Sequence, residues 1–379
     1  MSQIRPLIAA TLLVPSLVAC SEGAPPPPEP LTAEALAAIA PDAGAPRDQL
    51  ARQVDDLFAM EDIGETRAVV LIADGELAAE RYGEGYDADT RFVSWSMAKT
   101  VTAVLIGMLV ADGLLNIDEP APVDQWQRTG DPRADITLRH LLQMRAGLRH
   151  TEAGNPPYES SEVRMLFLDG RDDMARWARE QPLEAEPGER FEYSSNTTVI
   201  LADIAARALT DSEDPETRRR AVADYLQERL FGPLGMESIV PEFDASGTLI
   251  GGSLMHATAR DWARFGEFLR LKGRAPGGEQ LVPRRWVEAM VTPSPTAAQY
   301  GFQTWLNRPL EEPREDGGHP LFPDRAPQSL FAMIGHMGQY VFVSPEQRLT
   351  LVRLGHSDDA ERPPLLQQAA DVLELYPQR

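Results

Sequence analysis

The sequence predicts an α/β (α+β) fold, in which an antiparallel sheet of about five strands is flanked by N- and C-terminal helices and carries a large, mostly helical inserted domain. Two observations predict this arrangement. Short strand-like runs occur near both ends of the chain, whereas the long region between them shows helical spacing and loops. The chain has 379 residues, enough for two or three structural units with a substantial core.

The strand candidates are five short apolar runs, two early in the chain and three late. They are residues 68–73, 77–82, 330–334, 340–343 and 349–354. Asp74-Gly75 is a hairpin signal between the first two. Amphipathic helices are expected at 48–58 and at about 364–375. We therefore predict a sheet domain made of residues 45–85 plus 328–379, and a mostly helical domain at 86–327.

The first 20 residues predict export and a lipid anchor. One positive charge at Arg5 precedes an apolar stretch over 7–19 that is too short to span a membrane, as is typical of a signal peptide. Cys20 is the only cysteine and stands where a bacterial lipoprotein is cleaved and lipidated. We expect a lipoprotein signal peptide at 1–19 and a Pro/Ala-rich tether at 20–44. By resemblance to Gram-negative lipoproteins, Ser21 after the cysteine implies an outer-membrane lipoprotein that faces the periplasm.

The charge balance excludes several classes of partner. There are 36 Lys plus Arg against 58 Asp plus Glu, a formal net charge of −22, so a basic face for nucleic acid is not expected. The histidines show no zinc-ligand spacing, and neither a metal nor another cofactor is implied. The expected partner, beside the lipid anchor, is a small-molecule or peptide-like substrate, and nothing in the sequence specifies an oligomeric state.

The strongest local signal for chemistry is the stretch 94–100, Ser-Trp-Ser-Met-Ala-Lys-Thr, at the start of an apolar helix. Only two lysines, Lys99 and Lys272, occur among the 36 basic residues, and Lys99 falls in this motif. On a helix Ser96 and Lys99 are neighbours at i and i+3, so the amine can reach the hydroxyl. A buried lysine loses its proton readily and can then accept one from serine. The alternative is a surface Ser and Lys on an amphipathic helix, which the apolar residues 101–111 disfavour.

With this motif and two others, the sequence resembles the serine hydrolases of the β-lactamase and penicillin-binding-protein superfamily. The second motif of its class C-like members matches Tyr193-Ser194-Ser195, and the third matches His336-Met337-Gly338 before a predicted strand. The likeness spans about residues 50–375 and is nearest to the branch of 6-aminohexanoate-dimer hydrolases and related esterases. It implies a β-lactamase/transpeptidase-like fold.

The resemblance also implies roles for individual residues. Ser96 is the nucleophile, Lys99 the base, and Tyr193 a proton carrier between Lys99 and the leaving group. The backbone N–H groups of Ser96 and Gln339 form the oxyanion hole. The remaining implied contacts to substrate come from His336, Gly338 and Ser195, with Tyr158 as a pocket-lining residue; for Tyr158 a turn aromatic is the alternative.

The sequence therefore predicts a serine hydrolase that cleaves an ester or an amide through an acyl-enzyme on Ser96. His336 stands where a class C β-lactamase has lysine, so efficient hydrolysis of β-lactams is not expected, since histidine is only fractionally charged near neutrality. A D-alanyl-D-alanine peptidase or weak β-lactamase is the enzymatic alternative. A non-catalytic envelope binding protein of the same fold is the alternative from another class.

Overall fold

The protein was analysed as a computed structural model, which describes residues 30–310, 321–322 and 324–379. Cys20, the predicted signal peptide and the first part of the predicted tether lie outside the described residues. The helices are α1 (Ala33–Ala37), α2 (Arg47–Ala59), α3 (Ala98–Ala111), α4 (Leu138–Leu142), α5 (Ser161–Phe167), α6 (Met174–Arg179), α7 (Ser195–Leu209), α8 (Pro215–Leu226), α9 (Gly232–Leu234), α10 (Ala259–Arg270), α11 (Arg284–Met290) and α12 (Arg362–Glu374). The strands are β1 (Glu65–Ala73), β2 (Glu76–Tyr82), β3 (Phe92–Val93), β4 (Val240–Pro241), β5 (Met255–Ala257), β6 (Trp305–Leu306), β7 (Phe331–Gly335), β8 (Gln339–Ser344) and β9 (Leu349–His356).

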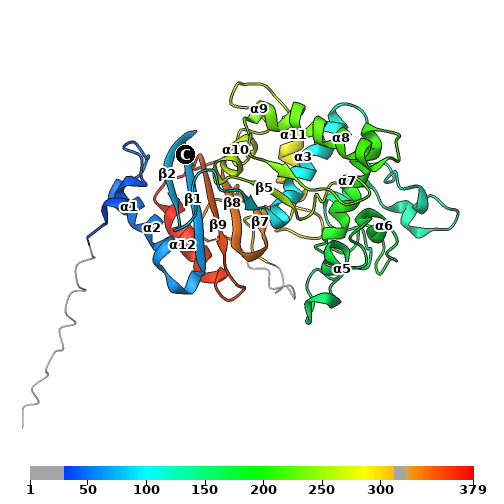
Figure 1. Cartoon of the computed structure of the whole chain (residues 1–379), viewed down its shortest axis with the longest axis horizontal. Coiled ribbons are helices and arrows are strands. Elements are labelled where there is room, and N and C mark those ends of the chain that lie inside the picture. The colour runs from blue at the N-terminus through cyan, green and yellow to red at the C-terminus, as the bar shows by residue number, and fades with distance from the viewer. Residues whose placement is uncertain (1–29, 311–320, 323) are drawn as a thin grey trace, which may run out of the picture.

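One antiparallel sheet joins the two ends of the chain. Its strand order is β2-β1-β9-β8-β7-β6, so β1 near the start pairs with β9 near the end, with Val70 opposite Val352. The predicted fold class is confirmed, and all five predicted strands are present. The sixth strand, β6, has only two residues and forms the edge beyond β7. Figure 1 shows this sheet at one end of the molecule and the helices α3, α5, α6, α7 and α8 beyond it.

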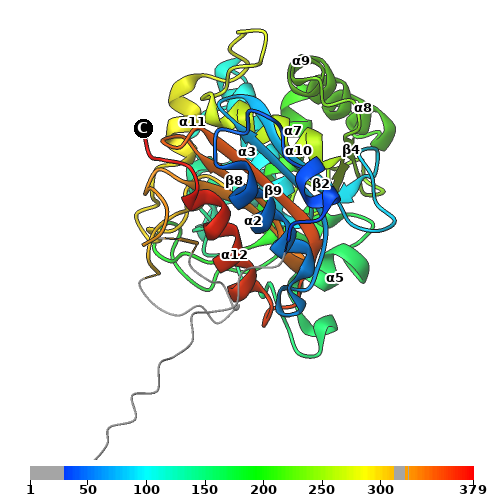
Figure 2. The same ribbon diagram turned by 90° about the vertical axis from the view of Figure 1, so that its left-hand side faces the viewer.

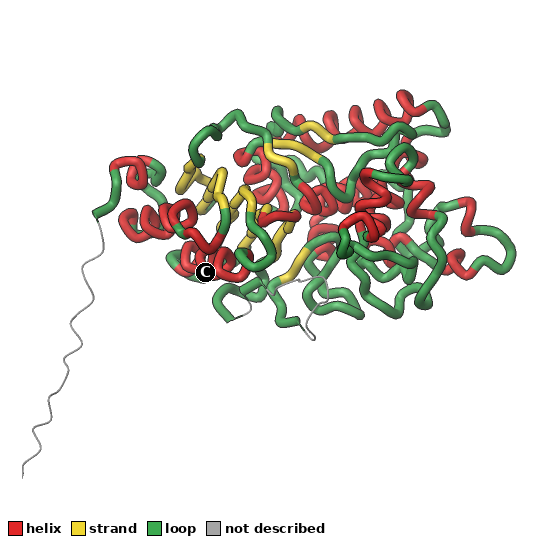
Figure 3. Tube along the Cα trace, turned by 60° about the horizontal axis from the view of Figure 1, so that its bottom comes forward, coloured by secondary structure: helices red, strands yellow, loops and turns green. Residues whose placement is uncertain are grey.

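The two faces of the sheet are covered by different helices, as alternation along each strand requires. Val69 and Leu71 of β1 belong to an apolar core with residues of α2 and α12, whereas Ala68 and Val70 belong to the larger core on the other face. In Figure 2, α2 and α12 lie in front of the strands. Figure 3 shows the strands gathered together, with most of the helices to one side. The helical region therefore packs against one face of the sheet, and α2 and α12 pack against the other.

The region between the sheet segments is not wholly helical. A small second sheet, in the order β3-β5-β4, brings Phe92 and Val93 against Met255–Ala257. Strands of two or three residues are too short to show the alternation of apolar and polar residues, so the sequence pattern does not predict them. This sheet matters for the site because β3 ends one residue before Ser94, which begins the Ser-x-x-Lys stretch.

The segment expected to be a tether is folded over its later part. Residues 33–37 form α1, which begins at the capping residue Thr32, whose hydroxyl accepts from Ala35 N at 3.0 Å. Ile39 then makes a bridge to Ala79, which covers the outer edge of β2. An uncovered edge strand can pair with another molecule and aggregate. The contact of Ile39 with the edge of β2 protects that edge. Within the described part of the chain, no helix is long and apolar enough to cross a membrane.

Candidate active site

Ser96 lies in a tight turn at the entrance to α3. The turn is a 3₁₀ segment, Trp95–Met97, that runs directly into the helix. Trp95 has φ of 44°, a backbone conformation that is costly for a bulky L-residue and that is retained where the surroundings fix it. Ser94 helps to fix it, because its backbone N–H donates to Met255 O at 2.7 Å and its hydroxyl accepts from Met255 N at 3.1 Å. The small sheet thus anchors the start of the motif.

Lys99 is the centre of a buried polar cluster. Its side chain is 1% exposed, and Nζ donates to Ser96 Oγ at 2.9 Å, to Ser195 Oγ at 2.7 Å and to the carbonyl oxygen of Gly252 at 2.8 Å. These three acceptors match the three hydrogens of an ammonium group. When Lys99 is neutral, a lone pair replaces one hydrogen, and the Ser96 hydroxyl is placed to donate to it.

The surroundings of Lys99 act on its charge in two directions. Burial lowers the pKa of Lys99 below its ordinary value, while the carboxylates of Glu152 and Glu162 act to raise it. The position of Lys99 in the first turn of α3 favours loss of the proton as well, because the positive end of the helix dipole disfavours a cation. A lysine with a lowered pKa supplies the neutral amine that a serine nucleophile needs as its base.

Glu152 completes this cluster, although no motif in the sequence predicts it. Its Oε1 accepts from Ser195 Oγ at 2.6 Å and lies 3.8 Å from Lys99 Nζ, while its Oε2 accepts from Ser195 N at 2.8 Å and from His150 Nε2 at 2.5 Å. Burial acts to raise the pKa of Glu152, but the charge of Lys99 and the hydrogen bonds from His150 and Ser195 outweigh it and lower the pKa to about 2. Glu152 is therefore an ionised counter-charge to Lys99.

Tyr193 and Ser195 come from the segment that leads into α7. The ring centroid of Tyr193 lies 4.8 Å from Lys99 Nζ, and the ring packs against Tyr300 and Trp305 with centroids 5.9 and 5.2 Å away. Ser195, the first residue of α7, is fully buried and links Lys99 to Glu152. The structure thus brings together three predicted site residues, Ser96, Lys99 and Tyr193, and places Ser195 behind Lys99 in the buried interior.

His336, Gly338 and Gln339 form the turn between β7 and β8, beside the Ser96 turn. The His336 ring lies edge-on to Trp95, with centroids 5.4 Å apart. Desolvation by the surrounding protein atoms lowers the pKa of His336 below its ordinary value, which favours the neutral imidazole. The Gln339 side chain is buried, and its Nε2 donates to the carbonyl oxygens of His336, Met337 and Gly355 at 3.2, 3.0 and 2.7 Å. The Gln339 amide group therefore holds the turn from behind.

The same turn is held by a buried cation. Arg353 on β9 is fully buried and donates to Gly338 O at 2.9 Å through Nη1, and to Thr66 Oγ1 at 3.0 Å and Glu65 O at 3.0 Å. Burial lowers the pKa of Arg353 to about 10, which leaves it charged at neutral pH. The strand next to β8 thus fixes the position of the Gly338–Gln339 peptide.

Gly335, at the end of β7, lets the turn approach Ser94 closely. A Cβ atom at this position would lie 2.3 Å from Ser94 O, which is a backbone atom and cannot rotate away. We expect Gly335→Ala to lower the free energy of unfolding by about 1–3 kcal/mol and to reduce activity, because β7 must move away from the Ser96 turn. Thermal unfolding and ester hydrolysis would measure both effects. Gly277→Ala, where a Cβ would meet nothing within 4 Å, is the matched control; equal behaviour of the two variants would contradict the close-approach argument.

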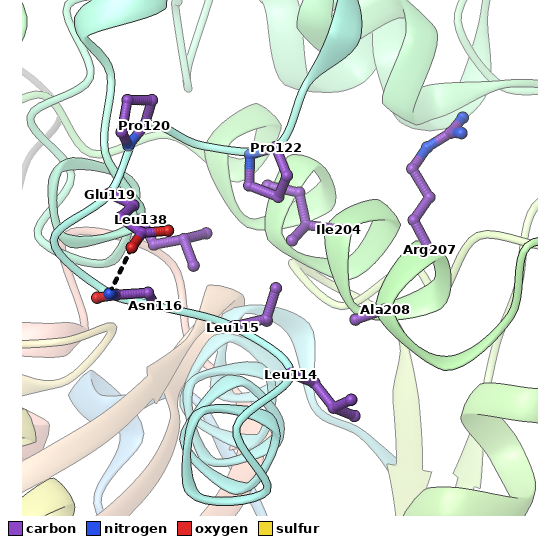
Figure 4. Close-up of a pocket in the computed structure, with 10 residues that line it drawn as sticks. All are labelled: Leu114, Leu115, Asn116, Glu119, Pro120, Pro122, Leu138, Ile204, Arg207 and Ala208. Carbon is purple, nitrogen blue, oxygen red and sulfur yellow. Dashed lines mark hydrogen bonds between the residues drawn. The ribbon is translucent and has the colours of Figure 1, made fainter.

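Two other features lie apart from this cluster. Tyr158, predicted as a pocket-lining residue, is 61% exposed on the turn Pro157–Glu159, and its role in the pocket stays a prediction. A pocket of about 280 Å³ lies past the C-terminal end of α3, at the opposite end of that helix from Lys99 (Figure 4). It is lined by Leu114, Leu115, Asn116, Glu119, Pro120, Pro122, Leu138, Ile204, Arg207 and Ala208. In the described residues, no group of three or more His, Cys, Asp or Glu is placed to hold a metal ion.

Comparison with known proteins decides the family. The Beta-lactamase family model matches residues 61–374, which is most of the chain. The chain belongs to the Beta-lactamase family. The predicted family is thereby confirmed. The match runs from just before β1 to the last residue of α12, so it includes both the sheet and the Lys99 cluster.

One curated relative and two solved structures agree with membership of the Beta-lactamase family. The 6-aminohexanoate-dimer hydrolase of Paenarthrobacter ureafaciens is 26% identical over 261 residues, which cover 64% of this chain and 62% of that protein, less than two thirds of its length. A Bacillus anthracis protein assigned as a 6-aminohexanoate-dimer hydrolase has a similar structure, with a TM-score of 0.65, 22% identity, and coverage of 86% of this chain and 83% of that one. EstCE1, a hydrolase with promiscuous acyltransferase activity, gives a TM-score of 0.62, 18% identity and coverage of 86% and 99%. These two structures share the fold.

Proposed function

We propose that this protein hydrolyses an ester or amide bond of a small molecule through an acyl-enzyme on Ser96. The observation that carries the proposal is the hydrogen bond of 2.9 Å between Lys99 Nζ and Ser96 Oγ, made by a lysine that is 1% exposed. A lysine is buried at such a cost only where its amine is used, since a solvated surface position is otherwise favoured. A hydroxyl paired with a buried amine is the pattern of an activated serine nucleophile.

The proposed reaction has two halves. Neutral Lys99 takes the hydroxyl proton as Ser96 Oγ attacks the carbonyl carbon, and the backbone N–H groups of Ser96 and Gln339 stabilise the oxyanion. Collapse of this intermediate breaks the bond to the leaving group, which receives a proton through Tyr193. Water then attacks the acyl-enzyme, releases the carboxylic acid and restores the Ser96 hydroxyl. No cofactor takes part in this scheme.

The substrate class follows from charge. His336 has no permanent charge, because desolvation lowers its pKa below the ordinary value, and the chain has a formal net charge of −22, so neither this residue nor the overall field favours an anionic substrate. We therefore propose a neutral ester or linear amide; among the proteins to which the chain is similar, EstCE1 is a hydrolase with promiscuous acyltransferase activity. A D-alanyl-D-alanine peptidase or weak β-lactamase is the second candidate, favoured by the family alone. A non-catalytic binding role is disfavoured by the connected cluster around Lys99.

Intact-mass spectrometry tests the proposal directly. We expect a fluorophosphonate probe to add one phosphonyl group to Ser96, because this probe traps an activated serine. Penicillin is expected to add little or nothing, since histidine stands at position 336, where a class C β-lactamase has lysine. Absence of the fluorophosphonate adduct on the folded protein would overturn the proposal, and a stable penicillin adduct would move the substrate assignment to the second candidate.

Replacing His336 by lysine should change the choice of substrate. In His336→Lys a fixed positive charge enters beside Trp95, so we expect kcat/KM for a penicillin to rise relative to that for a neutral ester, by about tenfold if the charge meets the carboxylate. Steady-state kinetics of both substrates in both proteins measure this ratio. His256→Lys, which puts the charge on β5 beside Glu242, is the control. An unchanged ratio in His336→Lys would mean that residue 336 does not face the substrate.

We also propose that the protein is exported and held to the outer membrane, facing the periplasm, through a lipid on Cys20. The support is the N-terminal sequence alone, namely Arg5, the apolar stretch 7–19 and the single cysteine. Metabolic labelling with a palmitate analogue should mark the wild type and not Cys20→Ser. Absence of label in the wild type would overturn this location.

A further inference from the structure

A second glutamate of the cluster, Glu162, has no part in the scheme above. It lies in the first turn of α5, and its Oε1 is 3.1 Å from Ser195 Oγ and 3.5 Å from Ser253 Oγ. Two glutamates thus converge on one serine hydroxyl, since Glu152 Oε1 is 2.6 Å from the same Ser195 Oγ. Two carboxylates this close to each other do not both remain ionised when they are buried.

The hydrogens around Ser195 Oγ can be counted. A serine hydroxyl has one hydrogen to donate and two lone pairs that accept. Lys99 Nζ lies 2.7 Å from Ser195 Oγ. A charged amine can only donate, so Lys99 donates a hydrogen to one of the two lone pairs. The Ser195 hydrogen goes to Glu152, which makes the shorter contact and is ionised. The remaining lone pair faces Glu162 Oε1, and this contact is a hydrogen bond only if Glu162 itself carries the hydrogen.

The electrostatics of the pair agree with this count. Burial, followed by the charge of Glu152, raises the pKa of Glu162 to about 8, whereas the pKa of Glu152 is lowered to about 2. The difference has a structural cause. Glu152 accepts hydrogen bonds from Ser195 N and His150 Nε2 in addition to the Ser195 hydroxyl, while Glu162 has only the hydroxyls of Ser195 and Ser253.

We propose that Glu162 is a positioning residue that is held as a neutral carboxylic acid at neutral pH and donates its hydrogen to Ser195 Oγ, so that Lys99 faces one carboxylate charge instead of two. The proposal rests on the proposed function, because it concerns the base of that reaction. A second negative charge near Lys99 would hold the proton on the amine more tightly and leave less neutral base to act on Ser96. Glu162 also fixes which way the Ser195 hydroxyl points, and Ser195 in turn orients Lys99.

The groups that face Glu162 come from every element packed around it. The stretch before α5 contributes Glu152, which His150 contacts in turn, α3 contributes Lys99, and α7 and the turn before β5 contribute the hydroxyls of Ser195 and Ser253. The other charged groups of α5 and α6 are paired elsewhere: Arg164 with Asp169, Arg176 with Glu180, and Arg179 with Asp203. The charge state of Glu162 is thus set within this cluster.

Carbon-13 NMR of protein labelled at the glutamate side-chain carboxyl measures the proton directly. We expect one carboxyl resonance to titrate with a midpoint above pH 7 and to be missing from Glu162→Gln. It should persist in Glu159→Gln, which removes an exposed glutamate of the neighbouring turn and should leave activity unchanged. A Glu162 resonance that titrates near pH 4 would overturn the proposal. This readout needs no catalysis, so it stands even if Ser96 proves unreactive and the proposed function fails.

The rate of fluorophosphonate labelling tests the consequence for Lys99. Glutamine is neutral and can donate a hydrogen bond, so Glu162→Gln should restore most of the rate that Glu162→Leu loses, which we expect to be about tenfold. The pH midpoint of labelling should fall by about one unit in Glu152→Gln, which removes a charge, and by less than about 0.3 unit in Glu162→Gln. Equal rates for the Gln and Leu variants, or an equal fall of the midpoint in Glu162→Gln, would overturn the proposal. If the Leu variant does not fold, the comparison of midpoints decides.

Discussion

Ser96→Ala is expected to reduce hydrolysis of a p-nitrophenyl ester by at least about 10³-fold while the protein remains folded. The substitution removes the only atom that can form the acyl-enzyme, Ser96 Oγ. It leaves Lys99 with two of its three acceptors, the Ser195 hydroxyl and the Gly252 carbonyl, so most of the hydrogen bonds that hold the amine remain. Steady-state kinetics and thermal unfolding measure the two parts of this expectation.

The control for Ser96→Ala is Ser212→Ala. Ser212 lies in the loop before α8, where its hydroxyl accepts from Asp214 N at 3.1 Å, and its loss should leave the rate within about twofold. If folded Ser96→Ala turned over the ester at the wild-type rate, the nucleophile would have to be sought elsewhere.

Lys99→Arg should be nearly as damaging as Lys99→Ala, with a loss of about 10²-fold or more. Arginine keeps the positive charge but is not deprotonated near neutral pH, so it cannot take the Ser96 proton. The wild-type rate should also fall as the pH is lowered, because protonation of Lys99 removes the base; the lowered pKa of Lys99 places this fall below the ordinary range of lysine. Steady-state rates and pH profiles of the ester reaction test both statements.

The chain offers a matched control in its other lysine. Lys272 is exposed and pairs with Glu288 at 3.2 Å, so Lys272→Arg should keep the charge, the ion pair and the rate. If Lys99→Arg retained more than about a tenth of the wild-type rate, a barrier increase below about 1.4 kcal/mol, Lys99 would serve as a fixed charge and not as the base.

The part of the site that the sequence predicts is the part governed by local geometry. Ser96 and Lys99 are three residues apart at the start of one helix, so their hydrogen bond follows from helical spacing. The five main strands show apolar runs bounded by turn residues. Tyr193 and the turn at His336 have no such local signal, and only the resemblance to a family predicts their roles. The match over residues 61–374 confirms that family.

Glu152 and Glu162 escaped prediction for a physical reason. They lie in a stretch rich in Pro, Gly and polar residues, where a glutamate is ordinarily a solvated surface group. Their burial depends on the approach of α3, α7 and the turn before β5, which no spacing in the sequence encodes. His150 shows no zinc-ligand spacing with the other histidines, and its contact with Glu152 likewise appears only in the folded chain.

The pairing of β1 with β9 sets the order in which the molecule can be completed. Glu65 lies opposite His356, so β1 gains its second neighbour only after nearly the whole chain has emerged from the ribosome. Until then the β1–β2 hairpin has a bare edge, and a two-stranded ribbon of this kind is marginally stable in water. Contacts so distant in sequence close slowly, because the ends of a long loop must first meet. The helical region, which holds Ser96 and Lys99, can pack before the sheet is complete. The sheet that carries the His336 turn forms last, so this turn meets Ser96 and Lys99 only at the end of folding.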